Sequence, residues 1–453
     1  MKDLKTIILA AGEGTRMKSK KPKVLHKIFD KSMIKYVIDT AKKSNSDEIC
    51  VVIGHKSDEV REEIEKENIK IAVQNERKGT GHAVMQAMDF IEDDKDILIL
   101  YGDTPLITSD TLNNLLDCHR KNSEIGVSFI SAIVDNPSGY GRIIRDKDNN
   151  FLKIVEDKDA NDEEKAIKEI NTGIYLFKGK DLRYALNNLK NDNIQSEYYL
   201  TDCLELILKS GKKVSSTVVD GINEFLGVNS REQLADATQK LQERINKKHI
   251  ENGVTIIDTK NTYISSDAEI GMDTIIYPGC VIEGKTVIGE NCSIGPNSQI
   301  TNMIIHDNVK FQSSTGIDSE IGSNTNVGPY AYIRPNSTIG ENVKIGDFVE
   351  VKNSVIGDKT KVSHLTYIGD ADVGKRINFG CGTVIVNYDG KKKHRTIIED
   401  DVFIGCNTNL VAPVTVKKGS YIAAGSTITK NVPEDVLAIA RARQQIIEGL
   451  TKK

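Results

Sequence analysis

The sequence lacks any apolar run long enough to span a membrane, and its start lacks the cleavage site of a secretory signal peptide. Its seven cysteines are scattered, odd in number and never spaced as C-x-x-C, which argues against a disulfide framework and a zinc site. An excess of one charge is also missing, because 61 Lys and Arg face 65 Asp and Glu, a net charge of −4. We therefore expect a cytoplasmic protein with reduced thiols that binds small molecules rather than nucleic acid or membranes.

The 453 residues are too many for one ordinary core and fit two or three domains. In the first half, strand-like apolar runs such as Thr6–Ala10 alternate with amphipathic helical patterns such as Ile34–Lys43. This alternation predicts an α/β domain with a mostly parallel, Rossmann-like sheet over residues 1–229. Ser230 can cap the helix that follows, and we interpret residues 230–252 as a linker helix.

A six-residue period replaces this alternation in the second half. Aliphatic residues recur at this spacing in three runs: Ile264, Ile270, Ile276, Ile282, Ile288, Ile294 and Ile300; Ile321, Val327, Ile333, Ile339, Ile345 and Val351; Ile398, Ile404, Leu410, Val416, Ile422 and Ile428. Neither a helix nor a flat strand has this period, whereas a parallel β-helix places one such side chain per short side in a shared core. We predict a β-helix with a C-terminal arm over residues 253–453; the spacing leaves its handedness open.

A glycine-rich segment, Leu-Ala-Ala-Gly-Glu-Gly-Thr-Arg-Met at residues 9–17, follows the first predicted strand. Glycine lets the backbone approach a phosphate chain, and Arg16 and Lys23 add neutralising charge, so the segment predicts a triphosphate site. A dinucleotide fingerprint would need a third glycine where Met17 stands, and the sequence contains no G-x-x-x-x-G-K-[ST] motif.

This segment resembles the signature of sugar-phosphate nucleotidyltransferases. Gln-Asn-Glu at 74–76, Gly-Thr-Gly-His-Ala at 79–83 and His-Leu-Thr-Tyr-Ile-Gly-Asp at 364–370 narrow the resemblance to a bifunctional family, uridylyltransferases of N-acetylglucosamine 1-phosphate that also acetylate glucosamine 1-phosphate. The resemblance covers Leu4 to about Arg441. It implies a left-handed β-helix, the substrates UTP, acetyl-CoA and glucosamine 1-phosphate, Mg²⁺ as cofactor, and a homotrimer with acetyl-transfer sites between neighbouring β-helices.

For the first half, the resemblance implies contacts to UTP and the sugar nucleotide from Leu9, Ala10, Ala11, Gly12, Gly14, Lys23, Gln74, Gly79, Thr80, Tyr101, Gly102, Asp103, Gly139, Glu156, Asn171 and Asn229. Asp103 ends a predicted strand, and the resemblance pairs it with Asn229 as the metal ligands. The implied reaction is in-line attack of a sugar 1-phosphate oxygen on the α-phosphorus of UTP. Such a displacement needs positioning and charge neutralisation, to which Arg16 and Lys23 would contribute, and no nucleophilic side chain. Taken alone, His82 is expected to be structural.

For the second half, the period gains a residue between Ile385 and Ile398, which predicts an extruded loop that includes the basic residues 391–395. An amine attacks a thioester only after deprotonation, and His364 is the candidate base. The resemblance assigns the amino-sugar phosphate to Arg334, Lys352, Tyr367, Asn378 and Lys393, and acetyl-CoA to Cys381, Asn387, Tyr388, Cys406, Ala424 and Arg441. Cys406 departs from the family, which commonly has serine there, and a thiol is the weaker hydrogen-bond partner.

Two alternatives are left open. One is a glucose-1-phosphate adenylyl- or thymidylyltransferase with a β-helix tail, against which the His364 motif and Asn387 and Tyr388 argue. The other is a non-enzymatic regulatory subunit that keeps both folds. The sequence retains the charged and predicted metal-binding residues, which argues against a non-enzymatic subunit; these residues are Arg16, Lys23, Asp103 and Asn229.

Overall fold

The structure is a computed structural model of the 453-residue chain and describes residues 3–54, 58–221 and 223–448. The chain divides into two compact units, Met1–Leu241 and Gln242–Lys453. The division falls inside helix α8 (Arg231–Glu251). The hydroxyl of Ser230 accepts a hydrogen bond from the Gln233 backbone N–H at 3.2 Å, which caps the start of this helix. No helix of the described part is both long and apolar enough to cross a membrane.

The first unit is built on one mixed sheet, with strand order β11-β7-β10-β6-β1-β4-β5 and β8 and β9 attached to β10. Its strands are β1 (Leu4–Ala10), β4 (Glu48–Gly54), β5 (Lys70–Gln74), β6 (Asp96–Tyr101), β7 (Ile125–Ile133), β8 (Arg142–Arg145), β9 (Phe151–Val155), β10 (Glu169–Lys178) and β11 (Lys213–Asp220). Pairs β1–β4, β1–β6, β4–β5 and β7–β11 are parallel, whereas β10 runs antiparallel to its neighbours β6 and β7. The predicted mostly parallel α/β sheet is confirmed.

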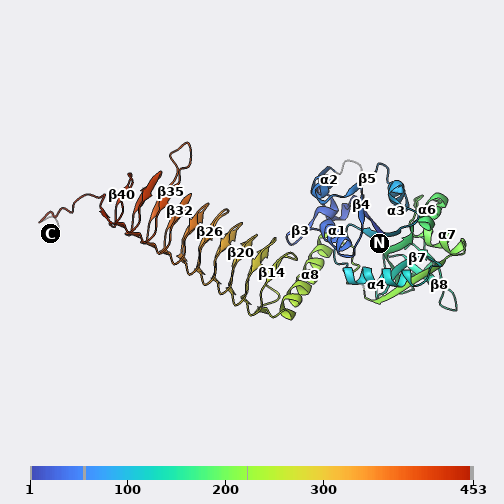
Figure 1. Ribbon diagram of the computed structural model, residues 1–453. Helices are drawn as coiled ribbons and strands as arrows, with labels where there is room; N and C mark the ends of the chain where they lie inside the picture. The colour runs from blue at the N-terminus through green and yellow to red at the C-terminus, as the bar shows by residue number, and fades with distance from the viewer. Residues whose placement is uncertain (1–2, 55–57, 222, 449–453) are drawn as a thin grey trace. The chain divides into compact units, whose positions relative to one another are not determined.

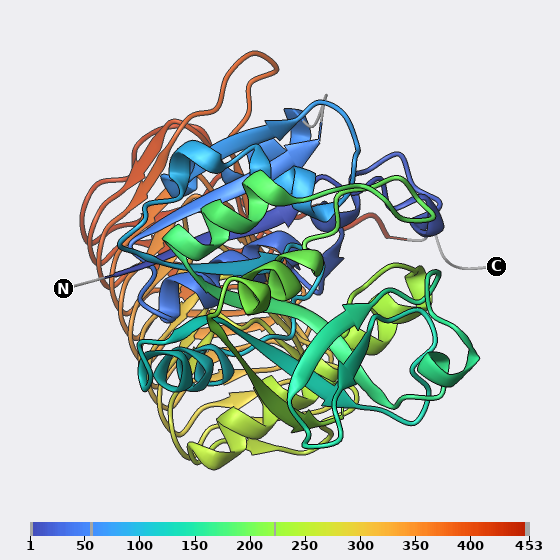
Figure 2. The same cartoon turned by 90° about the vertical axis from the view of Figure 1, so that its right-hand side faces the viewer.

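Helices cover both faces of this sheet, as Figure 2 shows. Successive residues of β1 point to opposite faces: Ile7 packs in the cluster that includes residues of α3, α6 and α7, and Ile8 in the cluster that includes residues of α1, α2 and α4. The helices of the unit are α1 (Met33–Lys43), α2 (Asp58–Ile64), α3 (Thr80–Met85), α4 (Ser109–Arg120), α5 (Asp162–Lys165), α6 (Gly179–Asn188) and α7 (Asp202–Lys209). Short 3₁₀ turns η1 (Thr15–Met17), η2 (Lys23–Leu25), η3 (Glu65–Glu67) and η4 (Met88–Phe90) and the hairpin β2 (Lys27–Ile28) and β3 (Lys31–Ser32) complete it.

The second unit is a parallel β-helix, in which three sheets run along a stack of coils (Figure 1). The first sheet contains β12 (Thr255–Ile256), β15 (Ile275–Ile276), β18 (Ser293–Ile294), β21 (Lys310–Phe311), β24 (Asn326–Val327), β27 (Lys344–Asp347), β30 (Lys361–His364), β33 (Asn378–Phe379), β36 (Phe403–Ile404), β39 (Tyr421–Ile422) and β41 (Leu437–Ala438). The second contains β13 (Tyr263–Ile264), β16 (Val281–Glu283), β19 (Gln299–Thr301), β22 (Thr315–Ile317), β25 (Tyr332–Ile333), β28 (Glu350–Lys352), β31 (Tyr367–Gly369), β34 (Val384–Val386), β37 (Asn409–Val411) and β40 (Thr427–Ile428). The third contains β14 (Glu269–Ile270), β17 (Val287–Ile288), β20 (Ile304–Ile305), β23 (Glu320–Ile321), β26 (Thr338–Ile339), β29 (Val355–Ile356), β32 (Ala371–Val373), β35 (Thr396–Ile398) and β38 (Val414–Val416).

The aliphatic residues of the six-residue period form the core of this unit. Ile282, Ile333, Val351 and Ile368 are fully buried, and each such side chain contributes about 1.5–3 kcal/mol by leaving water. The apparent gap between Ile300 and Ile321 is filled by Ile305, Phe311 and Gly316, which occupy the equivalent rungs at five- and six-residue steps. A Cβ at Gly316 would lie 3.1 Å from Met303 Cε and 3.3 Å from the Phe311 ring, so these two side chains occupy the space that the missing side chain leaves.

Candidate functional sites

A pocket of about 320 Å³ lies at the carboxyl ends of β1, β5 and β6 in the first unit. Ten of the predicted residues line it: Leu9, Ala10, Ala11, Gly12, Lys23, Gln74, Gly79, Thr80, Tyr101 and Asp103. In open α/β sheets, ligands bind at this edge because the loops after the strands converge there. The structure therefore brings most of the predicted nucleotide residues together in one cavity.

Two glycines let loops of this pocket approach their neighbours closely. Gly14 has φ +64°, and a Cβ on it would lie 2.5 Å from the Lys23 Cβ. Gly79 has φ +98°, and a Cβ there would lie 2.5 Å from the Tyr198 carbonyl oxygen. A side chain at either position would strain the backbone and displace that neighbour. The glycine-rich segment can thus present its backbone N–H groups to phosphate oxygens.

A cation already lies where the predicted metal ligands converge. The Lys23 ammonium contacts an Asp103 carboxylate oxygen and lies 3.0 Å from the Asn229 amide oxygen. Lys23, Asp103 and Asn229 come from η2, the end of β6 and the segment before α8, so the fold gathers two oxygens around one positive charge. Carboxylate and amide oxygens are ligands that divalent cations such as Mg²⁺ prefer, and the donor set fits such an ion.

The Gln74 side chain is buried and held in one orientation. Its amide Nε2 donates to the Gly79 carbonyl oxygen at 3.1 Å and lies 3.1 Å from His82 Nδ1. The His82 ring stacks on Tyr198 with ring centroids 6.3 Å apart. His82 therefore acts as a support for Gln74, in agreement with its predicted structural role, and the amide orientation of Gln74 is fixed before any base binds.

Glu156 and Asn171 lie together near the pocket. A Cβ built on Gly141 would be 3.5 Å from Glu156 Oε2 and 3.6 Å from the Asn171 Cβ, so both residues border Gly141. Burial raises the pKa of Glu156 above its ordinary value, and Thr201 donates to the carboxyl at 3.1 Å. Burial, followed by the charges of Glu156 and Asp103, raises the pKa of Tyr101.

Not all predicted residues line the cavity. Arg16 is exposed in η1, Gly139 is exposed with φ +84°, and Gly14, Gly102, Glu156, Asn171 and Asn229 lie outside the lining.

Conversely, the lining includes Val24, Arg77, Ala83 and Glu197, which sequence reasoning missed. Arg77 forms an ion pair with Glu13 of the glycine-rich segment. Arg77 lies in the sequence between the motifs at 74–76 and 79–83, and this position could have indicated that it belongs to the same pocket.

In the second unit, most of the predicted acetyl-transfer residues lie on the outer face of the second sheet or at its two flanking corners. Arg334, Lys352 and Tyr367 follow or belong to β25, β28 and β31, successive strands of that sheet. His364, Cys381 and Cys406 lie at the corner before the sheet, and Asn387 lies at the corner after it. Asn378 is on β33 of the first sheet.

His364 is exposed and paired with Asp347. Its Nδ1 lies 2.5 Å from Asp347 Oδ1, and the two residues are in register on β30 and β27. The hydrogen bond from His364 lowers the pKa of Asp347, so the carboxylate is ionised and can only accept. Nδ1 must then carry a hydrogen, so that in the neutral imidazole Nε2 is the acceptor nitrogen, which is the arrangement that a general base needs.

Three basic side chains, Arg334, Lys352 and Lys393, lie close to one another. The Lys352 side chain contacts Lys393, and Arg334 and Asp370 lie near enough for their charges to influence the pKa of Lys393. Lys393 and then Asp370 raise the pKa of Lys352, whereas Lys352 lowers the pKa of Lys393. Such a cluster favours an anion with more than one charge, such as a phosphate monoester.

The predicted extruded loop is present between β34 and β35 and projects from the stack of coils in Figure 1. At its start, the buried Asn387 donates to Asp370 at 2.5 Å and lies 3.4 Å from the Tyr367 hydroxyl. At its end, Arg395 binds Asp372, with Nε 2.7 Å from one carboxylate oxygen. Both ends of the loop are therefore tied to the coil below it.

The residues predicted to contact acetyl-CoA continue along the corner of His364. The Asn407 N–H donates to the Cys381 carbonyl at 2.8 Å, and the Gly425 N–H donates to the Cys406 carbonyl at 2.8 Å, which places Cys381, Cys406 and Ala424 on consecutive rungs. A Cβ on Gly425 would be 3.7 Å from Arg441 Cδ, so Arg441 borders this column. Cys406, Ala424 and Tyr388 are exposed.

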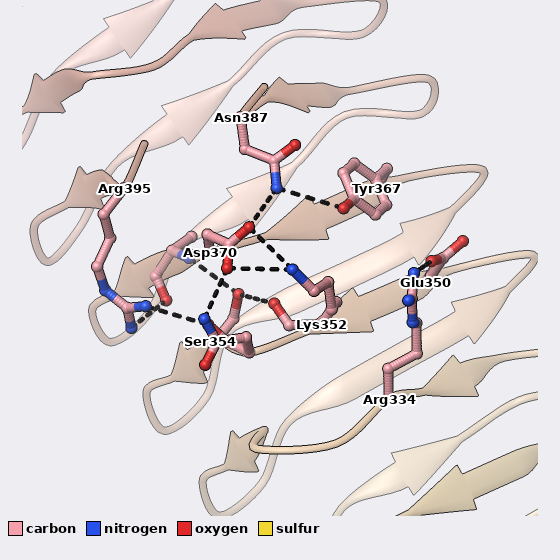
Figure 3. Close-up of polar contacts among 10 residues, drawn as sticks. Arg334, Glu350, Lys352, Ser354, Tyr367, Asp370, Asn387 and Arg395 are labelled. Carbon is pink, nitrogen blue, oxygen red and sulfur yellow. Dashed lines mark hydrogen bonds and ion pairs between the residues drawn. The ribbon is translucent and has the colours of Figure 1, made fainter. Parts of the chain in front are cut away.

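Sequence reasoning missed three carboxylates of this site: Asp347, Glu350 and Asp370. Glu350 accepts from Arg334 Nη1 at 2.7 Å (Figure 3). Asp347 precedes its partner His364 by 17 positions, and Asn353 and Asp370 are also 17 apart. Aligning the coils at that spacing would have placed these pairs side by side.

Comparisons with known proteins give the same two-part division. The nucleotidyl transferase family profile matches residues 5–244, and the bacterial transferase hexapeptide profile, of six repeats, matches residues 318–353 and 395–430. The bifunctional protein GlmU of Clostridioides difficile is 55% identical over 100% of this chain and 98% of its own length. Those of Acetivibrio thermocellus and Clostridium kluyveri are 54% and 56% identical, over 99% and 97% of this chain and 97% and 96% of theirs.

The chain belongs to the bifunctional GlmU family. The predicted function is confirmed: the protein transfers an acetyl group from acetyl-CoA to glucosamine 1-phosphate, and a uridylyl group from UTP to N-acetylglucosamine 1-phosphate. Family membership sets aside both alternatives left open by the sequence. It also confirms the left-handed β-helix of hexapeptide repeats, and it implies small-molecule substrates and a divalent metal for nucleotidyl transfer.

Proposed function

We propose that the pocket of the first unit is the uridylyl-transfer site, and the observation that carries this proposal is the convergence of Lys23, Asp103 and Asn229 beside the glycine-rich segment. Gln74, Gly79 and Thr80 would hold the uracil base, and Glu156, Asn171 and Gly139 the sugar and ribose. Arg16 and Lys23 would neutralise phosphate charge as pyrophosphate leaves. The displacement needs in-line positioning and charge neutralisation, and these residues are of the types that supply both.

Asp103 and Asn229 would hold Mg²⁺ as protein ligands. When bound, this ion supplies positive charge to the phosphate oxygens. Among the described residues, no group of three His, Cys, Asp or Glu could hold a metal ion, so the protein would provide few ligands and water or phosphate the others. Magnesium sites that serve nucleotides commonly have this composition, which is the reason for choosing Mg²⁺.

The second site is the outer face of the second sheet with its corners, where His364 would act as general base. Arg334, Lys352, Lys393, Tyr367 and Asn378 would hold the amino-sugar phosphate. Nε2 of His364 takes a proton from the substrate ammonium, and the amine nitrogen attacks the thioester carbonyl carbon. The C–S bond breaks, and the proton that the nitrogen loses on becoming an amide passes to the sulfur, so that CoA leaves as the thiol. Asn387, Tyr388, Cys381, Cys406, Ala424 and Arg441 would hold acetyl-CoA.

The chain would work as a homotrimer, because an apolar column stands beside this site. Tyr330, Phe348 and Leu365 are 62, 57 and 57% exposed, and the Tyr330 and Phe348 rings stack with centroids 5.6 Å apart. All three have positive φ, at a corner where other coils have Asn, Ser or Gly, as at Asn297, Ser313 and Gly382. Bulky residues at positive φ are costly, so their use on an exposed corner favours a contact with a second copy of the chain.

We expect Phe348→Glu to break the trimer, because it places a charge in this column. Sedimentation should then show single chains, acetyl transfer should fall by at least about 100-fold because the site lies between subunits, and uridylyl transfer should persist. Ile304→Glu, on an exposed position of the third sheet, is the matched control and should remain trimeric. A monomeric Phe348→Glu protein with full acetyl transfer would place the whole site within one chain.

We also propose residues 1–229 and 253–453 as the uridylyltransferase and acetyltransferase domains, joined by the helix at 230–252. Each unit has its own hydrophobic core in support of this division. A purified fragment ending after α8 that stays unfolded would contradict it. The two site assignments are tested separately by His364→Ala and Asp103→Asn.

A further inference from the structure

One buried carboxylate joins the two halves of the acetyl-transfer site. Asp370 is 7% exposed and accepts three side-chain donors: Lys352 Nζ at 3.1 and 3.3 Å, Asn353 Nδ2 at 2.6 Å and Asn387 Nδ2 at 2.5 Å (Figure 3). Lys352 is proposed above for the sugar phosphate and Asn387 for acetyl-CoA. We propose that Asp370 is a positioning residue that holds these two groups in a fixed relation. This inference rests on the proposed function of the site.

The chemistry of the contacts requires a carboxylate at this position. Lysine and the two asparagine amide nitrogens only donate, so four lone-pair sites of an ionised carboxylate can satisfy them together. Burial opposes the charged form of Asp370, but hydrogen bonds from Asn353 and Lys352 hold its pKa below the ordinary value. The charged carboxylate therefore persists at neutral pH, and the Lys352 ammonium stays beside it.

The contact also fixes the extruded loop. Asn387 begins the loop and is held by Asp370, while Arg395 ends it and donates to the Asn353 and Ala371 carbonyls at 3.1 and 3.2 Å. Tyr388 and Lys393 lie between these two anchors and are both exposed. Without the contact between Asp370 and Asn387, the loop would be held only by Arg395. Lys393 and the loop residues proposed for CoA would then no longer be held in position.

A similar hydrogen bond between corner residues of successive coils, elsewhere in the β-helix, supplies a control. Asp318 occupies the equivalent corner three coils earlier, with φ 45° against 52° for Asp370. It accepts Asn302 Nδ2 at 3.0 Å, as Asp370 accepts Asn353. The Asp318 hydrogen bond lies outside the predicted site residues. Loss of either carboxylate therefore removes a corner hydrogen bond, and only the loss at Asp370 also removes a contact to the site.

We expect Asp370→Ala to raise the KM for both glucosamine 1-phosphate and acetyl-CoA and to lower kcat/KM for acetyl transfer about 10–100-fold. Asp370→Asn keeps the volume but offers one oxygen to three donors, so its loss should be intermediate. Asp318→Ala removes one exposed hydrogen bond of the same kind and should leave both KM values unchanged. Uridylyl transfer and the oligomeric mass should be the same in all three variants.

A purely structural role would reduce the active fraction, hence kcat alone, and would leave both KM values of Asp370→Ala unchanged. KM values of Asp370→Ala within about twofold of wild type, or equal rises in Asp318→Ala, would overturn the inference. Wild-type protein that releases no CoA from acetyl-CoA and glucosamine 1-phosphate would instead refute the proposed site and this inference with it. An active wild type with an unaffected Asp370→Ala variant would refute the inference alone.

Discussion

His364→Ala should lose acetyl transfer by about 10²–10⁴-fold in kcat, the usual effect of removing a general base. The exposed imidazole of His364 is held by Asp347 with Nε2 free to accept a proton, whereas alanine offers no acceptor. The KM for acetyl-CoA should change little, because the column of Cys381, Cys406 and Ala424 remains. The rate is followed by the appearance of the CoA thiol.

Two further readouts separate a lost base from a damaged fold. Raising the pH should restore part of the His364→Ala rate, because a larger fraction of the substrate amine is then free without help from a side chain. Uridylyl transfer from supplied N-acetylglucosamine 1-phosphate should stay near wild type. A correctly assembled His364→Ala protein that acetylates at the wild-type rate near neutral pH would remove His364 from the mechanism.

Asp103→Asn should lower uridylyl transfer by about 100-fold or more, because it removes a charged ligand from the proposed metal site and a counter-charge from Lys23. Pyrophosphate release measures this loss, and a higher Mg²⁺ concentration should recover part of it. CoA release should remain near wild type. Equal loss of both activities would indicate misfolding and would contradict the assignment of Asp103.

The β-helix was predictable because its core repeats. Ile282, Ile333 and Ile368 each fill the same rung position, so a strict spacing in the sequence translates directly into a buried stack. The gap after Ile300 hid three rungs, which make up one coil, since Phe311 and Gly316 compensate each other in volume and neither is aliphatic and branched. Volume complementarity between residues of neighbouring strands is invisible to a pattern that examines one position at a time.

The sites were predictable where the chain presents contiguous motifs. The glycine-rich segment and the residues 74–80 line one pocket because each follows a strand of the same sheet edge. Asp347 and Asp370 escaped because each acts on a residue 17 positions further along the chain, in the next coil, whereas a contiguous motif describes only one coil. Arg77 escaped because an exposed arginine between two motifs has no pattern of its own.

We propose that one chain has two separate sites for consecutive reactions. The most direct measurement incubates the pure protein with glucosamine 1-phosphate, UTP and Mg²⁺, with and without acetyl-CoA, and follows CoA thiol and pyrophosphate separately. We expect CoA to appear first, and pyrophosphate to follow only when acetyl-CoA is present or when N-acetylglucosamine 1-phosphate replaces the amino sugar. Pyrophosphate release at the same rate from glucosamine 1-phosphate without acetyl-CoA, or no CoA release at all, would contradict it.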